Sequence, residues 1–388
     1  MRAEESTFLA LLREFAGGGK AEIPDELDWG GLYEIAQSQS LVGLCYVLLR
    51  DRGIPADDLD RFHQGFLGEV YQAVNRAACM RAFSERTAEQ GIEILPFKGW
   101  AVKDCWPVPE LRSMGDLDVL IHTEDREATD AIMKELGYSR FIDNHAVWTY
   151  TERSVMFEIH DHMFYEYLAN DFDYRAYFDR AWEYGQNPGF QLCYLLTHMA
   201  KHITNSGLGF RFFLDLVFFC RANAERIRWD EVKKELDVLR LKEFAATCFA
   251  LCRAWFGCDI PFAEQELDPG FYAFVTEKMF RDGVFGLENE QNEAAHTAKE
   301  MKRSKGPYWL TALKLTLKKL FPPYEDMQLI PWYSFVDGRP WLLPAAWVYR
   351  WVYCLLHKRK HGEKLLAEPF TKRDTVEKRE QLIRGWGL

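Results

Sequence analysis

The segment at residues 115–121, GDLDVLI, constrains this chain most strongly, because it places two aspartates at the start of an apolar run. Side chains alternate between the two faces of a strand, so Asp116 and Asp118 share one face. Aspartate is disfavoured in strands, and two like charges on one face repel each other unless a cation lies between them. The segment therefore indicates a strand whose two carboxylates serve a metal ion.

A third acid lies in a strand-like segment about forty residues further along the chain. In VMFEIH at 155–160 the alternation places Glu158 and His160 on one face. If the two strands are neighbours, three carboxylates gather at one site, and burying so many unpaired charges would be very costly. Hard oxygen ligands suit Mg²⁺, and two ions about 4 Å apart can clamp both oxygens of a phosphoryl displacement. The alternative is a set of solvated acids at a strand edge, without metal.

The residues around these acids predict a small mixed sheet. A short apolar run at 92–97 and the run at 117–121 each indicate a strand, and helical periodicity follows with Thr123 as its N-cap and Gly137 as its stop. Two alternating segments at 146–151 and 155–160, separated by a tight turn, predict a hairpin.

Helical periodicity dominates the rest of the sequence. The fold class we predict is an α/β (α+β) core with a small mixed sheet, embedded in a predominantly α-helical protein. The expected regions are an N-terminal helical region at 1–90, the core at 91–170, a helical domain at 171–320 and a C-terminal helical extension at 321–388.

The charge balance argues against a nucleic-acid partner. The chain has 59 acidic and 48 basic residues, a net charge of -11, so no overall positive field would attract a polyanion. The basic run HKRK at 357–360 is expected to be a solvated helix end.

The predicted localisation is cytoplasmic. Nine cysteines, an odd number without a CxxC pair, do not suit a disulfide framework or a zinc ribbon, and the acidic N-terminus does not resemble a signal peptide. The apolar segment at 341–356 is too short to span a membrane and contains Pro344 and Arg350, so it predicts a buried or interfacial helix. No transmembrane segment is expected, and contact with a membrane surface is the less favoured alternative.

The stretch LPFKGWAVKDCWPVPELRSMGDLDVLIHTED, with FEIH after it, resembles the core of the polymerase-β-type nucleotidyltransferase superfamily. More narrowly, the chain is similar to an uncharacterised bacterial nucleotidyltransferase family with long helical extensions. This similarity rests on KG at 98–99, Arg112, GDLD at 115–118, GY at 137–138, EIH at 158–160 and the later segments LLTHMAKHI and RFFLDLV. It implies transfer of a nucleoside monophosphate from a nucleoside triphosphate to a hydroxyl of an unknown small-molecule or protein acceptor, with release of pyrophosphate.

The resemblance also implies roles for individual residues. Asp116, Asp118 and Glu158 would be the catalytic and metal-binding acids, with Mg²⁺ or Mn²⁺ as the cofactor, while Lys98 and Gly99 would lie against the triphosphate. One departure from the superfamily pattern is Trp100, which stands where a phosphate-binding serine usually follows the glycine. Triphosphate binding is therefore expected to depend on backbone N–H groups, on Lys98 and on Ser113.

Four further residues have two interpretations each. Arg112 could contact phosphate oxygens, to which a planar guanidinium is well suited, or form a structural salt bridge. His160, and the pair His198 and His202 four residues apart on one helix face, could line the acceptor side or simply pack in the core. The chain as a whole has a second interpretation, a catalytically inactive nucleotide-binding or regulatory module with the same fold.

Overall fold

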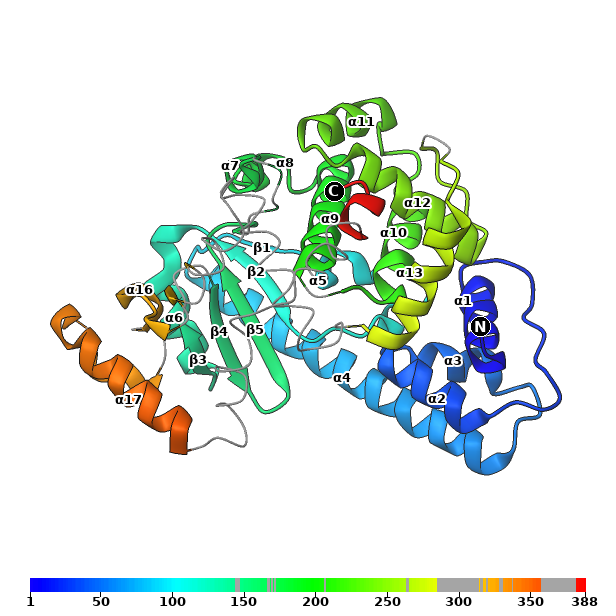
Figure 1. The fold of residues 1–388 in the computed structure, drawn as a ribbon, viewed down its shortest axis with the longest axis horizontal. Coiled ribbons are helices and arrows are strands. Elements are labelled where there is room, and N and C mark those ends of the chain that lie inside the picture. The colour runs from blue at the N-terminus through cyan, green and yellow to red at the C-terminus, as the bar shows by residue number, and fades with distance from the viewer. Residues whose placement is uncertain are drawn as a thin grey trace.

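The computed structural model describes residues 1–143, 147–165, 168, 170, 172–205, 207–262, 265–284, 314, 317–318, 320–327, 331–336, 338–356 and 382–388. Helices dominate these residues, and a single sheet of five strands lies among them. The predicted fold class, a small mixed-sheet core within a mostly helical protein, is confirmed. Figure 1 shows the sheet beside a group of helices that comes later in the chain, with the long helix α4 passing beneath both.

The N-terminal region is a group of helices. It contains α1 (Ala3–Phe15), α2 (Trp29–Ser38), α3 (Val42–Leu49) and α4 (Ala56–Glu89). The acid Glu69 of α4 accepts hydrogen bonds from the backbone N–H groups of Val42 and Gly43, at 3.1 and 3.0 Å, and so caps the start of α3. Helix α4 then continues to the sheet, so that one long helix connects the two regions (Figure 1).

The sheet has the strand order β1-β2-β5-β4-β3. Its strands are β1 (Ile94–Pro96), β2 (Leu117–Ile121), β3 (Ser139–Asp143), β4 (Val147–Glu152) and β5 (Val155–His160). Strands β2 and β5 pair in parallel and the other neighbours pair antiparallel, so the sheet is mixed, as predicted. Between them lie α5 (Gly99–Lys103) and α6 (Arg126–Glu135).

The two faces of the sheet contact two separate hydrophobic clusters. One face buries Leu117, Val119 and Phe157 in a cluster that includes residues of α4 and α6. On the opposite face, Leu120 belongs to a larger cluster formed mainly by helices from both sides of the sequence. Because side chains alternate along β2, the aspartate of this strand lies on the face that looks toward the larger helical cluster.

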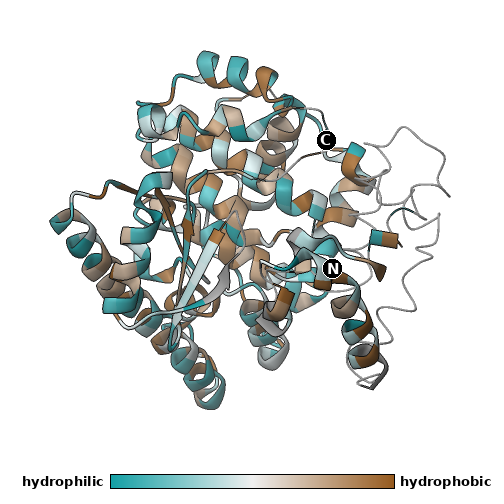
Figure 2. Ribbon diagram, turned by 90° about the vertical axis from the view of Figure 1, so that its left-hand side faces the viewer, coloured by the Kyte–Doolittle hydropathy of each residue, from teal (hydrophilic) through white to brown (hydrophobic). Residues whose placement is uncertain are grey.

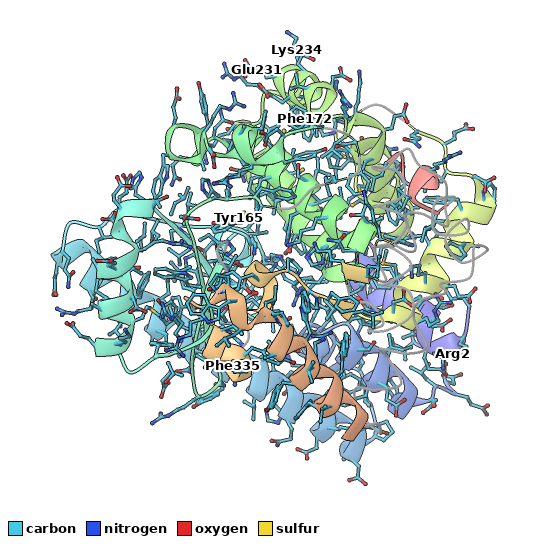
Figure 3. All side chains as sticks on the ribbon, turned by 60° about the vertical axis from the view of Figure 1, so that its left-hand side comes forward. Arg2, Tyr165, Phe172, Glu231, Lys234 and Phe335 are labelled. Atoms are coloured by element: carbon cyan, nitrogen blue, oxygen red, sulfur yellow. The ribbon has the colours of Figure 1, made fainter. Side chains whose placement is uncertain are left out.

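The later helices form the larger cluster. They are α7 (Tyr174–Phe178), α8 (Ala181–Tyr184), α9 (Pro188–Asn205), α10 (Phe210–Ala222), α11 (Trp229–Val238), α12 (Lys242–Phe256) and α13 (Pro269–Asp282). Helices α9 and α10 are almost entirely buried, whereas α11 covers them and is polar on its outer side (Figure 2). Glu231 and Lys234 of α11 point outward in Figure 3.

Two local expectations were wrong. Thr123 does not cap a helix by its side chain, because it begins a 3-10 turn (Thr123–Asp125) that leads into α6. Strand β3 was not predicted; it pairs with β4 through a register shift between Arg140 and Ile142. Such an irregular strand interrupts the strict alternation on which strand prediction depends.

The apolar segment near the C-terminus forms α17 (Leu343–Leu356), preceded by α16 (Tyr324–Met327) and two 3-10 turns. Among the described residues, Trp341, Val348 and Val352 are exposed rather than buried. No helix in the described part of the chain is both long and apolar enough to cross a membrane. The basic run at 357–360 lies outside the described residues.

Candidate functional site

The parallel pairing of β2 and β5 places Asp118 directly beside Glu158. His160 follows two residues later on the same face of β5, which brings its ring to the same point. Each of these three side chains offers one ligand atom, and the three atoms lie within 4.8 Å of one another. The strand adjacency on which the sequence argument depended is therefore present for Asp118 and Glu158, and His160 joins them.

The three side chains differ in exposure. Asp118 is buried, with 2% of its side chain exposed, and His160 is buried as well, whereas Glu158 retains 26%. Glu158 therefore lies on the accessible edge of this group, which we call the acidic cluster and define as Asp118, Glu158 and His160.

Asp116 lies just before β2 and interacts with the acidic cluster through its charge. Burial, followed by the negative charge of Asp118, raises the pKa of Asp116 to about 6, and Lys98 opposes this increase. The carboxylate of Asp116 is not among the ligand atoms of the acidic cluster. A cation placed between Asp116 and Asp118 would relieve the repulsion that raises this pKa.

Lys98 supplies a positive charge to the acidic cluster. Its ammonium group donates to Oδ1 of Asp118 and lies 3.5 Å from Oε2 of Glu158. Burial opposes a charged lysine, but the surrounding carboxylates, Asp118 foremost, outweigh it and raise the pKa of Lys98. The residue has a positive φ of 50°, a conformation that is uncommon for residues other than glycine, at the turn that leads from β1 into α5.

His160 is held against Asp118. Its Nε2 lies 3.0 Å from Oδ1 of Asp118, and the ring of Phe97 packs edge-on against the imidazole, with 5.0 Å between the centroids. Burial favours the neutral form of Asp118, but Lys98 and then His160 together lower the pKa of that carboxyl below its ordinary value. Nδ1 of His160 is buried and has no hydrogen-bond partner among the described residues.

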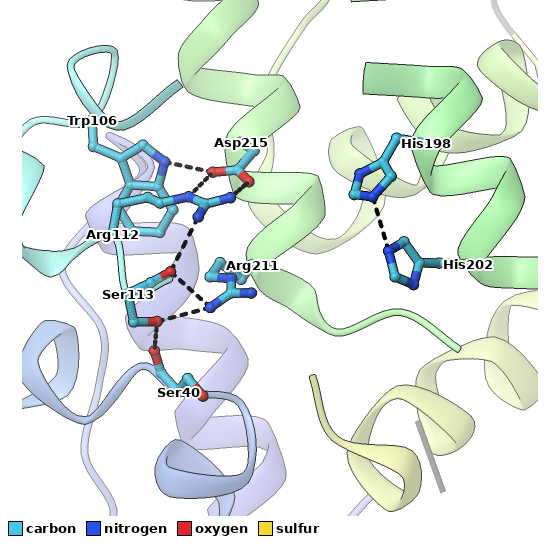
Figure 4. Close-up of polar contacts among 8 residues, drawn as sticks. All are labelled: Ser40, Trp106, Arg112, Ser113, His198, His202, Arg211 and Asp215. Carbon is cyan, nitrogen blue, oxygen red and sulfur yellow. Dashed lines mark hydrogen bonds and ion pairs between the residues drawn. The ribbon is translucent and has the colours of Figure 1, made fainter. Parts of the chain in front are cut away.

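Arg112 makes a structural ion pair. Two of its guanidinium nitrogens contact the two carboxylate oxygens of Asp215, Nε to Oδ1 at 3.2 Å and Nη2 to Oδ2 at 2.7 Å, and both side chains are buried (Figure 4). The indole N–H of Trp106 donates to the same carboxylate at 2.8 Å. Of the two interpretations of Arg112, the salt bridge is therefore the one that its contacts match.

Ser113 is also held by α10. Nη1 of Arg211 donates to the carbonyl oxygen of Ser113 at 2.7 Å and to its Oγ at 3.0 Å, and this hydroxyl donates to the carbonyl of Ser40 at 2.7 Å (Figure 4). We call residues 112–116 the Asp116 loop. Two contacts hold this loop against α10, one from Arg112 to Asp215 and one from Arg211 to Ser113. Arg211 and Asp215 are four residues apart on α10, and the sequence gave no indication of their partners.

Gly99 allows a close approach to Arg112. A Cβ atom at this position would lie 2.3 Å from Nη1 of Arg112, so that a side chain here would displace the guanidinium. Trp100, which follows, packs instead against the hydrophobic cluster on the other face of the sheet, with the ammonium of Lys103 4.5 Å above its ring. Trp100 therefore occupies the sequence position of the phosphate-binding serine, but its ring packs in the hydrophobic cluster and not in the site.

His198 and His202 contact each other on α9. Their Nε2 atoms are 3.1 Å apart, and Figure 4 shows the pair on a separate helix from the arginines. Burial, then the positive charges of Lys201, Lys98 and Arg211, lower the pKa of His202 to about 3. The pKa of His198 is also lowered, mainly by burial and then by His202. The pair is thus neutral at physiological pH and lies within electrostatic range of Lys98.

Two residues after β5 turn away from the acidic cluster. The carboxylate of Asp161 lies 3.5 Å from Nε of Arg126, and Nδ1 of His162 lies 2.6 Å from Oδ1 of Asp179. Asp161 and His162 thus contact other side chains and are not among the ligand atoms of the acidic cluster.

The acidic cluster has a donor set that could hold a metal ion. Two carboxylates are the ligands that Mg²⁺ prefers, and an imidazole beside them is also compatible with Mn²⁺. The unpartnered Nδ1 and the short contacts from Lys98 show a site whose negative charge is already balanced by a nearby cation.

Comparison with known proteins identifies one family. The pattern of a family described as "Uncharacterised nucleotidyltransferase" matches residues 25–257, which is more than half of the chain and includes every residue of the acidic cluster. No curated protein and no solved structure matches the chain.

Proposed function

The chain belongs to this uncharacterised nucleotidyltransferase family, and from that premise we propose that it is a metal-dependent enzyme that moves a nucleoside monophosphate from a nucleoside triphosphate to an acceptor hydroxyl. Pyrophosphate is the leaving group. The observation that carries the proposal is the parallel pairing of β2 and β5, which sets Asp118 beside Glu158 with Asp116 just before the strand. Asp116, Asp118 and Glu158 are the acids that we assign to the site.

Mg²⁺ or Mn²⁺ is the ion that we assign to these acids. Bound there, it would neutralise the phosphate charge that develops in the transition state and lower the pKa of the acceptor hydroxyl. Asp116 and Asp118 would hold the ion that carries the triphosphate, and Glu158, the most exposed of the cluster, would face the acceptor. His160 keeps Asp118 in place by the contact at its Nε2.

Lys98 has a part in this proposal that the sequence alone did not assign. Its ammonium group lies between Asp118 and Glu158, where it offsets two negative charges and keeps them close together before an ion binds. An incoming divalent cation would compete with this ammonium for the same oxygens. We propose that Lys98 then turns to a phosphate oxygen, because a lysine side chain is a flexible point charge.

The same contacts favour a second candidate function. A lysine that holds the carboxylates permanently would exclude the ion, and the chain would then be a nucleotide-binding module without catalysis. The two candidates differ in one measurable respect, since both predict nucleotide binding but only the first predicts pyrophosphate release.

Pyrophosphate release from each of the four common nucleoside triphosphates, with Mg²⁺ or Mn²⁺ and a small-molecule extract as the source of acceptor, tests the proposal. We expect release by the wild-type protein and a loss of roughly 100-fold or more in Asp118→Asn and Glu158→Gln. The matched control is Asp104→Asn, which removes an exposed acid outside the cluster. Calorimetric binding of a nucleotide without release would favour the module, and wild-type release by both acid variants would contradict the assigned site.

A further inference from the structure

One buried guanidinium in this structure has no carboxylate partner among the described residues. Arg211 of α10 is 5% exposed, and the hydrogen bonds that it makes run from Nη1 to the carbonyl and hydroxyl oxygens of Ser113. Its Nε is buried without any hydrogen-bond partner. Most of the donors of this cation are therefore unused.

Arg112 provides a comparison, because its guanidinium is buried nearby but has a carboxylate partner. Arg112 is 6% exposed, nearly as buried as Arg211, but its charge is matched by the two oxygens of Asp215. Burying an unmatched charge is costly, and the cost is reduced when an anion can reach the group. Burial and then the charge of Arg112 lower the pKa of Arg211 to about 10, so the group remains charged at physiological pH.

A second arginine, on α4, also lacks an anionic partner among the described residues. Arg76 of α4 is half-buried, its Nε has no partner, and it makes no ion pair with any described residue. One helical turn earlier, Oε1 of Gln72 is buried and unpartnered as well. Arg211 contacts the Asp116 loop through Ser113, and the charges of both Arg76 and Arg211 interact with that of Asp116.

We propose that Arg211 and Arg76 bind the β- and γ-phosphates of the nucleoside triphosphate. This inference rests on the function proposed above, in which the ion held by Asp116 and Asp118 carries the triphosphate. Arg211 contacts Ser113 close to Asp116, the charges of both arginines act on Asp116, and neither forms an ion pair with Glu158, so we assign both to the triphosphate side of the acidic cluster. Guanidinium groups suit phosphate oxygens, because several N–H donors can bond to them at once.

The two arginines supply the phosphate-binding donors that the turn after β1 lacks. Trp100 replaces a hydroxyl side chain with an indole that packs in the core, and Lys98, which contacts two carboxylates until an ion displaces it, would reach a single phosphate oxygen. Ser113 is engaged too, since its hydroxyl donates to Ser40 and accepts from Arg211. We therefore assign the remaining phosphate donors to α4 and α10.

Calorimetric titration with inorganic pyrophosphate in the presence of Mg²⁺ tests the inference. We expect Arg211→Gln and Arg76→Gln each to weaken binding by roughly 10- to 100-fold, the worth of a charge-assisted hydrogen bond to phosphate. Arg228→Gln is the matched control, because it removes a positive charge from an exposed ion pair far along the chain, and its affinity should equal that of the wild type.

Thermal unfolding without ligand accompanies each titration. Arg211→Gln loses the two hydrogen bonds from Nη1 to Ser113, so its unfolding midpoint shows whether weaker binding comes from a loss of the fold. If Arg211→Gln fails to fold, Arg76→Gln still tests the inference. This variant should fold, because Nε of Arg76 has no hydrogen-bond partner among the described residues. Wild-type affinity for pyrophosphate in Arg76→Gln, and in Arg211→Gln where it folds, would overturn the phosphate site. That result would leave the proposed function standing if Asp118→Asn still abolished pyrophosphate release.

Discussion

The carboxylate of Asp118 is the group on which the proposed chemistry depends most. Both Lys98 and His160 contact one of its oxygens, Oδ1, and neither contacts Oδ2. Its lowered pKa keeps it ionised throughout the physiological range. A carboxylate that is buried, ionised and balanced by a displaceable ammonium is prepared to accept a divalent ion.

The contact between Arg112 and Asp215 is predicted to be a major contribution to stability. Asp215→Asn removes the counterion of a buried guanidinium and should lower the free energy of unfolding by about 3–5 kcal/mol, the range for breaking one side of a buried ion pair. Chemical denaturation measures the change. Asp237→Asn, which breaks an exposed pair with Lys242, should cost less than about 1 kcal/mol and serves as the control. Equal effects of the two variants would contradict the buried ion pair.

His202 is predicted to make stability depend on pH. Its pKa of about 3 in the folded protein is below that of an unfolded histidine, so the unfolded state binds more protons and stability falls as the pH falls from about 6.5 toward 3. The wild type should lose about 1–2 kcal/mol between pH 7 and pH 5 from this residue, allowing for its partial exposure. His202→Gln removes this part of the loss.

The measurement for His202 is the free energy of unfolding at pH 7 and pH 5 for both proteins. The groups whose charges act on His202 are Lys201, Lys98, Arg211 and Asp118. Asp116, whose pKa is raised to about 6, also titrates in this interval, so the difference between His202→Gln and the wild type is the quantity that reports on His202. Identical slopes for wild type and variant would contradict the lowered pKa.

At the scale of elements, the crossing of α3 over α4 depends on a glycine. A Cβ at Gly65 would lie 2.4 Å from Cγ1 of Val42, whereas no atom lies within 4 Å of a Cβ at Gly68 on the same helix. Gly65→Ala should therefore lower the free energy of unfolding by about 1–3 kcal/mol through overpacking, and Gly68→Ala should raise it by up to about 1 kcal/mol through helix propensity.

Urea denaturation of these two variants provides its own control, since they make the same chemical change three residues apart. Destabilisation by both would mean that α4 tolerates no alanine at either position. Stabilisation by both would mean that α3 and α4 are not in close contact at Gly65.

The elements also show what the sequence could and could not predict. Alternation in GDLDVLI and VMFEIH correctly predicted β2 and β5 and the shared face of Glu158 and His160, because burial on one face imposes a period of two. Strand β3 was missed because its pairing contains a register shift. The partner of Arg112 could not be predicted, since Asp215 is 103 residues away in the chain and only the packed helices bring the two together.

At the scale of the whole molecule, the acidic cluster lies on the sheet face that looks toward the larger helical cluster, and α9 and α10 contribute residues around it. His198 and His202 remain predicted acceptor-side residues, and the charge of Lys98 acts on both. The position of Lys98 between carboxylates depends on three elements at once, which is why sequence reasoning assigned it only to phosphate. On the proposal above, the helical regions would contribute phosphate donors to the site in addition to enclosing it.

The binding of Mn²⁺, followed by electron paramagnetic resonance with and without a non-hydrolysable nucleoside triphosphate, tests the central claim most directly because it requires no acceptor. The wild-type protein should bind Mn²⁺ more tightly when the nucleotide is present, and Asp118→Asn should lose roughly 10- to 100-fold or more of that affinity. The control Asp104→Asn should behave as the wild type does. Equal Mn²⁺ binding by Asp118→Asn and the wild type, with nucleotide present, would contradict the assignment of the acidic cluster as the metal site.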